Sequence, residues 1–254
     1  MSEMVVSEVR DDVLHVTVQR PEKHNALSGA VLARLREVFS EAAEDDTLKT
    51  AVLRGAGEKS FAAGGDLREL DAVRSEAETR AMTAGSRAAL DAIRRFPVPV
   101  LAALNGDARG GGAELAVACD FRLFAEHAHI GFIQGRLNVS TAWGGGGDLM
   151  TLVGPTVALR LLCSAEMIGA EQALALGLAD AIAEANDLDA AVARFLAPLR
   201  AQAPQVLRSF KALAMAARDG KPRAEIDAIE DDRLVANWQH ADHWAAAAGA
   251  LKKG

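Results

Sequence analysis

Two stretches with almost no side chains, FAAGGDL at residues 61–67 and ARGGGAEL at residues 108–115, determine how this chain is interpreted. Each follows an apolar run that we expect to form a strand, and each precedes a segment that we expect to be helical. Because glycine has no Cβ, it allows backbone N–H groups to approach a ligand closely, and it also allows positive φ in a tight turn. One such turn alone needs no ligand. Two of them, one strand–helix unit apart, favour a common ligand site.

The start of a helix supplies hydrogen-bond donors, because its first N–H groups have no partner within the helix. Two such donors that converge on one point form an oxyanion hole. Glu114 follows Gly111 by three residues, so its carboxylate lies within one turn of the donors and could act as a base on a substrate held there. Glu114 also has a purely structural interpretation, as an acid that stabilises the positive end of the helix dipole.

The other glycine-rich segments do not match the phosphate-binding motifs. GAGEKS at residues 55–60 resembles the end of a P-loop, but Glu58 stands where glycine is required. GGGAEL at residues 110–115 lacks the third glycine of the dinucleotide fingerprint. Nucleotide hydrolysis and nicotinamide-dependent redox chemistry are therefore poorly supported.

The composition is that of a globular protein of 254 residues, 50% hydrophobic and 25% charged. A formal net charge of −7 argues against a nucleic-acid partner. No apolar run approaches the ~18 residues of a membrane span, and the acidic N-terminal segment lacks the apolar region of a signal peptide. We expect a cytoplasmic protein with no membrane partner, in which Cys119 and Cys163 are reduced core residues.

The first part of the chain alternates between strand and helix patterns. Asp11 and Asp12 separate two apolar runs, which predicts a hairpin. Ser28 is a suitable N-cap for a helix with one apolar face. We expect that face to consist of Val31, Leu32, Leu35, Val38, Phe39 and Ala42.

Helical patterns dominate from Pro155 onward, apart from one short extended piece near residue 182. This change predicts a layered α/β core followed by helices. We place the core, with the ligand site, at residues 1–190 and the C-terminal helical region at residues 191–254.

Four motifs, taken in order, resemble the enoyl-CoA hydratase/isomerase family, also called the crotonase superfamily. They are VQRPEKHNALS, FAAGGDL, NGDARGGGAELAVACDFRL and AWGGG. The resemblance implies an α/β fold, a spiral of ββα units, followed by a C-terminal helical trimerisation region. It implies a homotrimer or a dimer of trimers. The substrate is an acyl-CoA thioester, so coenzyme A belongs to the substrate, and we expect neither a separate cofactor nor a metal ion.

The resemblance also assigns residues to the site. The thioester carbonyl is held by the backbone N–H groups of Gly65 and Gly111, and Glu114 is a catalytic acid or base. Arg20 is a further candidate for the phosphates of coenzyme A, together with Lys23 and His24. The residues implied to bind the substrate are Lys23, His24, Ala26, Ala62, Gly64, Asp66, Leu67, Gly110, Thr141, Trp143 and Lys211. Lys211 would reach the nucleotide from its own or a neighbouring subunit, or it is a solvated surface charge.

Three residues depart from the family's hydratases, which hold one water molecule between two carboxylates. Gln134 stands at the position of the second acid by an ungapped count, and an amide cannot transfer a proton at neutral pH. Trp143 replaces a small residue, and its side chain would narrow the acyl pocket or pack at the pocket wall. The segment resembles the WGG pattern of relatives that decarboxylate malonyl-type thioesters. Asp148 stands where arginine is common, and we interpret it as an N-terminal capping acid.

Three functions follow as alternatives. The first is an acyl-CoA enzyme that works through a thioester enolate, as a hydratase, an isomerase or a decarboxylase. The second is an acyl-CoA binder without catalysis, which has no need of Glu114 beside the donors. The third is a structural or RNA-binding protein, which the acidic composition disfavours.

Overall fold

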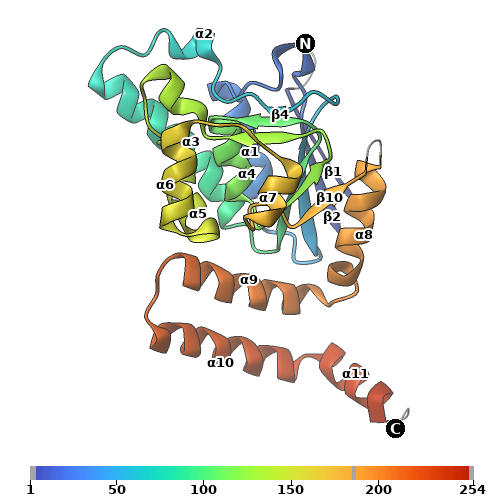
Figure 1. Cartoon of the computed structure of the whole chain (residues 1–254). Coiled ribbons are helices and arrows are strands. Elements are labelled where there is room, and N and C mark those ends of the chain that lie inside the picture. The colour runs from blue at the N-terminus through green and yellow to red at the C-terminus, as the bar shows by residue number, and fades with distance from the viewer. Residues whose placement is uncertain (1–3, 185–186, 252–254) are drawn as a thin grey trace.

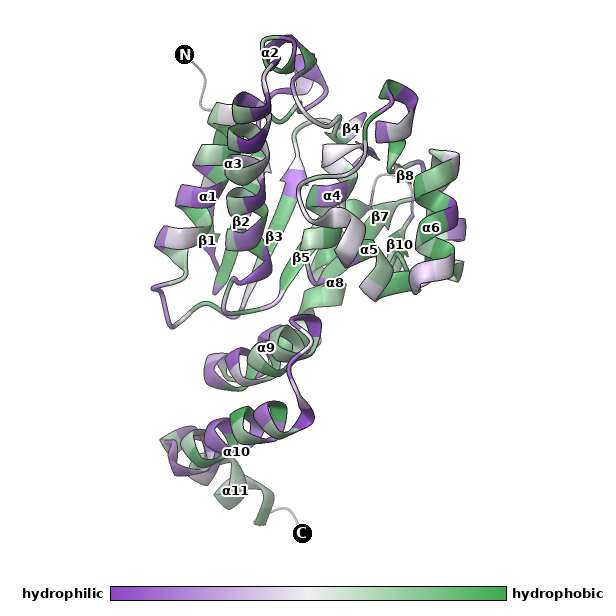
Figure 2. Cartoon of the chain, turned by 90° about the vertical axis from the view of Figure 1, so that its left-hand side faces the viewer, coloured by the Kyte–Doolittle hydropathy of each residue, from purple (hydrophilic) through white to green (hydrophobic). Residues whose placement is uncertain are grey.

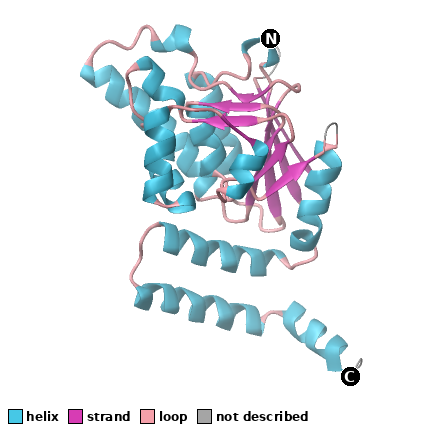
Figure 3. Ribbon diagram, viewed as in Figure 1, coloured by secondary structure: helices cyan, strands magenta, loops and turns pink. Residues whose placement is uncertain are grey.

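A computed structural model of the chain describes residues 4–184 and 187–251 (Figure 1). Its strands form two sheets, drawn in magenta in Figure 3. The six-stranded sheet has the order β1 (Val5–Arg10), β2 (Val13–Val18), β3 (Thr50–Gly55), β5 (Val100–Leu104), β7 (Phe121–Ala125) and β10 (Ala181–Ala183). The four-stranded sheet has the order β4 (Ser60–Ala62), β6 (Asp107–Arg109), β8 (His129–Gly131) and β9 (Ile168–Gly169).

The hairpin predicted at Asp11 and Asp12 is confirmed. Strands β1 and β2 pair antiparallel, with Arg10 opposite Val13. Asp11 and Asp12 have φ values of 52° and 64°, the left-handed conformation that a two-residue hairpin turn of the I′ type requires. Aspartate tolerates this conformation better than most residues, so the turn follows from local chemistry.

A ββα unit then repeats three times. In each unit the first strand (β3, β5 or β7) joins the large sheet and the second (β4, β6 or β8) joins the small one. The helices that follow are α2 (Leu67–Leu70) with α3 (Glu76–Arg94), then α4 (Gly111–Ala118), and finally the 3-10 helix η2 (Ile133–Leu137) with α5 (Gly145–Val153). This alternation confirms the predicted spiral. It also brings the starts of α2 and α4, each just after a strand of the small sheet, to neighbouring positions.

Helices α1 (Gly29–Ala42) and α3 cover one face of the large sheet and pack against each other. The Ser28 side chain accepts a hydrogen bond from the Val31 N–H at 3.2 Å, as its N-cap position predicts. The predicted apolar face of α1 is buried from Val31 to Phe39. Figure 2 shows hydrophobic strands beneath α1 and α3, and purple, hydrophilic residues on these helices.

The large sheet separates two apolar cores. Leu14 and Leu53 belong to the main core, which also holds α1, α3 and α4. Their neighbours Val13 and Val52 point to the opposite face and pack in a smaller cluster with α8 (Leu188–Arg200). Alternation along each strand therefore divides the molecule into two sides.

The last helices extend away from this body in Figure 1. After α6 (Pro155–Ser164) and α7 (Ala170–Ala175), the chain continues through α8 to α9 (Pro204–Arg218), α10 (Arg223–Gln239) and α11 (Ala241–Leu251). Helix α10 packs on α9, and neither α10 nor α11 contains a buried residue. No helix in the described ranges combines the length and apolar character that crossing a bilayer requires.

The expectation for the two cysteines is correct only in part. Cys119 is buried at the end of α4, and burial raises the pKa of its thiol to about 12. Cys163 is exposed, so its placement in the core was wrong. It lies on the outer side of α6, a helix that buries only Ala158 and Leu161.

Candidate active site

The two glycine-rich turns lie against each other. A Cβ built on Gly64 would come within 2.9 Å of the carbonyl oxygen of Arg109 and 3.3 Å of the backbone nitrogen of Gly111. Gly64 and Gly110 have φ values of 95° and 54°, which also favour glycine. Residues 61–67 and 108–115 therefore lie side by side, as a common ligand site would require.

The segment HNAL at residues 24–27 lies beside the first turn. The Ala63 N–H donates to the carbonyl oxygen of His24 at 3.0 Å, and the Leu27 N–H donates to that of Gly64 at 2.8 Å. The Asp66 N–H donates a hydrogen bond to the carbonyl oxygen of Leu27 at 3.3 Å. This short parallel pairing uses the backbone on either side of Gly65 and does not use the Gly65 N–H.

Gly65 and Gly111 keep their backbone donors unused. Neither N–H group donates a hydrogen bond to any residue within 4–184 or 187–251. The indole of Trp143 lies beside both: a Cβ on Gly111 would overlap its ring, and a Cβ on Gly65 would come within 3.7 Å of Cη2. The two donors therefore remain free for a ligand next to an aromatic wall.

Glu114 is held rigidly in the interior at only 2% exposure. Its Oε2 accepts hydrogen bonds from the backbone N–H groups of Trp143 and Gly145, both at 2.9 Å. Its Oε1 accepts one from the Gln134 amide nitrogen at 2.9 Å. Burial raises the pKa of the Glu114 carboxyl above its ordinary value, and these hydrogen bonds oppose the shift without cancelling it. The group can therefore serve as a proton donor or acceptor closer to neutral pH.

Gln134, in η2, occupies the space between Glu114 and the second turn. Its amide carbon lies 4.0 Å from the point where a Cβ on Gly110 would be. The amide nitrogen is used by Glu114, whereas Oε1 is buried and has no hydrogen-bond partner in the described part of the chain. The side chain thus presents a free acceptor, but it cannot transfer a proton.

A chain of ion pairs supports the loop that carries Trp143. The Arg94 guanidinium donates to the carbonyl oxygen of Trp143 at 2.9 Å and to the Asp148 carboxylate at 2.7 Å. Asp148 also accepts from Arg218 of α9 at 3.1 Å. Asp148 therefore anchors two arginines instead of capping α5, whose N-cap is Gly144, and the capping interpretation was wrong. Arg94 was missed in the sequence, because Trp143 and Asp148 are 49 and 54 residues away from it along the chain.

Lys211 lies apart from the glycine turns. It is 4% exposed, and its Nζ lies 2.6 and 2.5 Å from the two carboxylate oxygens of Asp120. Arg218 is 3.4 Å from the same carboxylate, which links this pair to the network around Asp148. Within the chain, Lys211 thus joins α9 to the start of β7, and the structure does not bring it together with Gly65 and Gly111.

Arg20 is also buried, contrary to its expected place at the phosphates. Its guanidinium donates to the Ala26 carbonyl oxygen at 2.7 Å and to Asp66 at 2.9 Å. The hydrogen bond from Arg20 lowers the pKa of Asp66, which caps α2 through the Arg68 N–H. Arg20 therefore positions the two segments and is not available at the surface.

The other residues that the resemblance assigns to the site differ in how far they are exposed to solvent. Ala62 and Gly64 are buried, Ala26 and Thr141 are half-buried, and Lys23, His24 and Leu67 are exposed. Thr141 lies next to Gly146, where its hydroxyl would be 2.6 Å from a Cβ. The arrangement thus runs from an exposed basic edge to a buried carboxyl group, which suits a long ligand with a polar end and a reacting end.

Comparisons with known proteins agree with this arrangement. The sequence model of the family described as Enoyl-CoA hydratase/isomerase matches residues 8–249. A crotonyl-CoA hydratase of Syntrophomonas wolfei is 31% identical over 212 residues, which cover 84% of this chain and 81% of that protein. An ethylmalonyl-CoA decarboxylase of Xenopus laevis is 34% identical over 177 residues, which cover 70% of this chain and 59% of that protein.

Solved structures give the same result over nearly the whole chain. The enoyl-CoA hydratase of Bacillus anthracis superposes with a TM-score of 0.93 at 26% identity, covering 99% of this chain and 97% of that one. An enoyl-CoA hydratase of Polaromonas sp. JS666 superposes with a TM-score of 0.89 at 33% identity, covering 98% and 97%. The fold, the adjoining glycine turns and the matched family model lead to one conclusion: this chain belongs to the enoyl-CoA hydratase/isomerase family.

Proposed function

We propose that the thioester carbonyl of an acyl-CoA lies between the backbone N–H groups of Gly65 and Gly111, which stabilise an enolate. Both donors are unused within the described ranges, and the turns that carry them are in contact. Donors that are already oriented toward a developing oxyanion lower the barrier without reorganisation. Family membership supports the acyl-CoA substrate.

Coenzyme A follows the segment beside the first turn. Lys23 and His24, which are exposed, meet its phosphates. Ala26, Ala62, Gly64, Asp66 and Leu67 line the path of its pantetheine arm and adenine, while Gly110, Thr141 and Trp143 border the acyl group. The pairing of residues 24–27 with the FAAGGDL turn supports this path. Lys211 contributes only if assembly of subunits changes its surroundings.

We propose further that Glu114 is the one residue that transfers a proton, and that the reaction is decarboxylation of a malonyl-type thioester. The observation that carries this proposal is the 2.9 Å hydrogen bond between Gln134 and Glu114. At this distance no water molecule fits between the two side chains, and an amide stands where the resemblance implies the second acid. Syn addition of water uses two proton-transferring groups, and losing one costs about 10²–10⁴ in rate.

Decarboxylation needs a single proton. The bond between Cα and the carboxylate breaks, and CO₂ leaves. The electron pair of that bond forms the enolate, whose oxygen accepts hydrogen bonds from the N–H groups of Gly65 and Gly111. Glu114, whose raised pKa favours the acid form, then protonates Cα and is reprotonated from solvent. The apolar wall of Trp143 also favours loss of a charged carboxylate, because the charge is poorly solvated there.

Double-bond isomerisation is the second candidate. A single carboxyl group with a raised pKa can remove a proton at one carbon and return it at another. Hydration is the third candidate, because it is the only one of the three reactions that uses a second proton-transferring group.

The test is a panel of alkylmalonyl-, 3-enoyl- and 2-enoyl-CoA thioesters incubated with the protein, with products identified by mass. We expect loss of CO₂ from the alkylmalonyl thioester to be fastest. Gln134→Glu should raise hydration of crotonyl-CoA, because it restores a second acid. Fast hydration by the unmodified protein that is unchanged in Gln134→Glu would contradict the one-acid proposal.

We propose that the chain assembles as a trimer or a dimer of trimers through its last helices. Helices α10 and α11 bury no residue, yet Leu234, Val235, Trp238 and Trp244 expose more than half of their surface. An exposed apolar face of this kind is typical of an interface. Light scattering that gives a single species of 26.7 kDa, the mass of one chain, would contradict assembly.

A further inference from the structure

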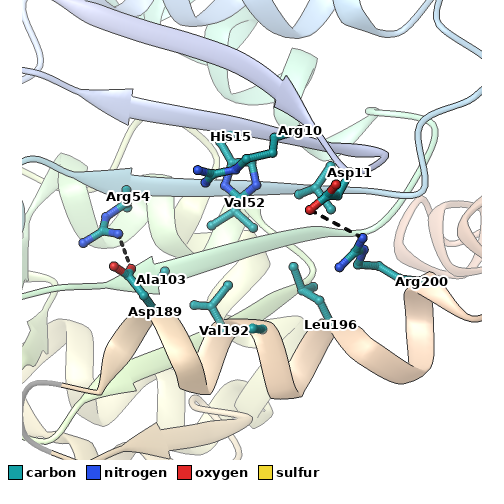
Figure 4. Close-up of a pocket in the computed structure, with 12 residues that line it drawn as sticks. Arg10, Asp11, His15, Val52, Arg54, Ala103, Asp189, Val192, Leu196 and Arg200 are labelled. Atoms are coloured by element: carbon teal, nitrogen blue, oxygen red, sulfur yellow. Dashed lines mark hydrogen bonds and ion pairs between the residues drawn. The ribbon is translucent and has the colours of Figure 1, made fainter.

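A cavity lies on the side of the large sheet away from Glu114. It has a volume of about 360 Å³ and opens between the β1–β2 hairpin, β3 and α8 (Figure 4). Val13, Val52 and Ala103 from the strands and Val192 and Leu196 from α8 form an apolar floor. Because the sheet lies between this floor and the core that holds α4, the cavity is separate from the proposed acyl-CoA site.

Basic side chains surround the apolar floor. Arg10 and His15 project from the hairpin, Arg54 from β3 and Arg200 from the end of α8 (Figure 4). Two carboxylates also line the cavity: Asp189 pairs with Arg54 at 2.5 Å, and Asp11 is 4.0 Å from Arg200. Three guanidinium groups against two carboxylates leave the lining with a positive charge.

Part of this positive charge is only weakly paired within residues 4–184 and 187–251. The Arg200 side chain, which is 39% exposed, makes no hydrogen bond to residues 4–184 or 187–251, and its ion pair with Asp11 spans 4.0 Å. Arg10 has only a loose, 3.6 Å pair with Glu8. Guanidinium groups bind carboxylates strongly when both oxygens are matched, so two arginines with such distant partners at one cavity leave N–H donors available to an anion.

The surroundings of His15 point in the same direction. Burial lowers the pKa of its imidazole, and the charges of Arg10, Arg54 and Arg200 lower it further, whereas Glu8 acts in the opposite direction. The positive potential of the three arginines therefore reaches the inside of the cavity, where an anion would be stabilised.

We propose that this cavity binds a small organic anion, a carboxylate with a short hydrocarbon chain. The guanidinium groups of Arg200 and Arg10 bind the carboxylate, since their planar N–H donors match its two oxygens. The hydrocarbon chain lies on Val13, Val52 and Leu196. A fully ionic ligand such as inorganic phosphate has no hydrocarbon part to contact this floor, and a neutral ligand would leave Arg200 with no anion closer than Asp11 at 4.0 Å.

Calorimetric titration of the full chain with butyrate tests the proposal, with 1-butanol and inorganic phosphate as comparison ligands. We expect saturable binding of butyrate only. Arg200→Gln and Arg10→Gln should each weaken it about tenfold or more, because each removes a charge-assisted pair. Arg194→Gln is the matched control on the same helix, since Arg194 pairs with Asp187 outside the cavity and should leave binding unchanged.

An NMR titration gives a second readout. Bound butyrate should raise the pKa of His15, whose charged neighbours are Glu8 and Arg10 on β1, Arg54 on β3 and Arg200 on α8. Absence of saturable binding, equal binding of 1-butanol, binding of phosphate in place of butyrate, or equal weakening by Arg194→Gln would each overturn the proposal. If circular dichroism shows that Arg200→Gln is misfolded, Arg10→Gln decides, because the Arg10 side chain is 62% exposed.

Discussion

Helix α4 and helices α10 and α11 are opposite extremes of burial in this molecule. Every residue of α4 is buried, whereas none of α10 or α11 is. Helix α4 is short and apolar on all sides, and both sheets, α3 and α5 surround it. Helices α10 and α11 carry apolar residues too, but Leu234, Val235, Trp238 and Trp244 remain more than half exposed to solvent within the described ranges. Burial within one subunit can therefore hold a carboxyl group such as Glu114 in place, and an arm of exposed helices cannot.

The largest expected effect is on catalysis. Glu114→Gln should lower the rate on the best thioester by about 10²–10⁴, because it removes the proposed proton-transferring group. The shape of the side chain is kept, so the melting temperature should change little. Glu230→Gln on α10 is the matched control: it makes the same chemical change on an exposed helix and should leave the rate unchanged. Equal rates in both variants would show that Glu114 is not catalytic.

A smaller effect is expected on stability. Leu115 of α4 is 0% exposed, and Leu115→Ala should lower the free energy of unfolding by about 2–5 kcal/mol through a cavity in the core. Leu234 of α10 is 56% exposed, and Leu234→Ala should change the free energy of unfolding of one subunit by at most about 0.5 kcal/mol. Urea unfolding at low protein concentration measures both. If light scattering shows that Leu234→Ala weakens assembly, α4 contributes to the stability of one subunit and α10 to the contact between subunits.

The smallest expected effect is on the pH dependence of stability. Burial raises the pKa of Glu114 in the folded state, so the folded chain binds this proton more tightly than the unfolded chain does. Below the ordinary glutamate pKa of about 4.3 the group costs no stability. As the pH rises from there through the raised pKa, the free energy of unfolding should fall relative to that of Glu114→Gln. Urea unfolding of both proteins across this range measures the difference, and parallel curves would contradict it.

The rate should depend on the same protonation. If Glu114 acts as the acid, decarboxylation should slow as the pH rises through its raised pKa.

Local chemistry was sufficient to predict the elements of the site. Glycine at positions 64 and 110 follows from positive φ, and Ser28 follows from the unpaired N–H groups at a helix start. The position of Glu114 one turn after Gly111 follows from the helical repeat. These properties depend on a residue and its neighbours in the chain, so they are visible in the sequence.

Partners that are far apart in the chain were not predictable. Arg20 and Lys211 resemble solvated basic residues in sequence, yet each is buried against an aspartate, Asp66 and Asp120 respectively. Cys163 lies in an apolar run of the sequence, but its side chain is on the exposed side of α6.

The sequence by itself determined the N-terminal hairpin, the helix capped by Ser28, the two glycine turns and the acid that follows the second. Only the tertiary structure decided that the Trp143 indole lies beside Gly65 and Gly111, that Gln134 bonds to Glu114, and that Arg200 has an unpartnered nitrogen. The physical reason is that turns, caps and periodicity arise from interactions within a few residues. Contacts between distant segments depend on how whole elements pack, and packing then determines which charges find partners and which remain free.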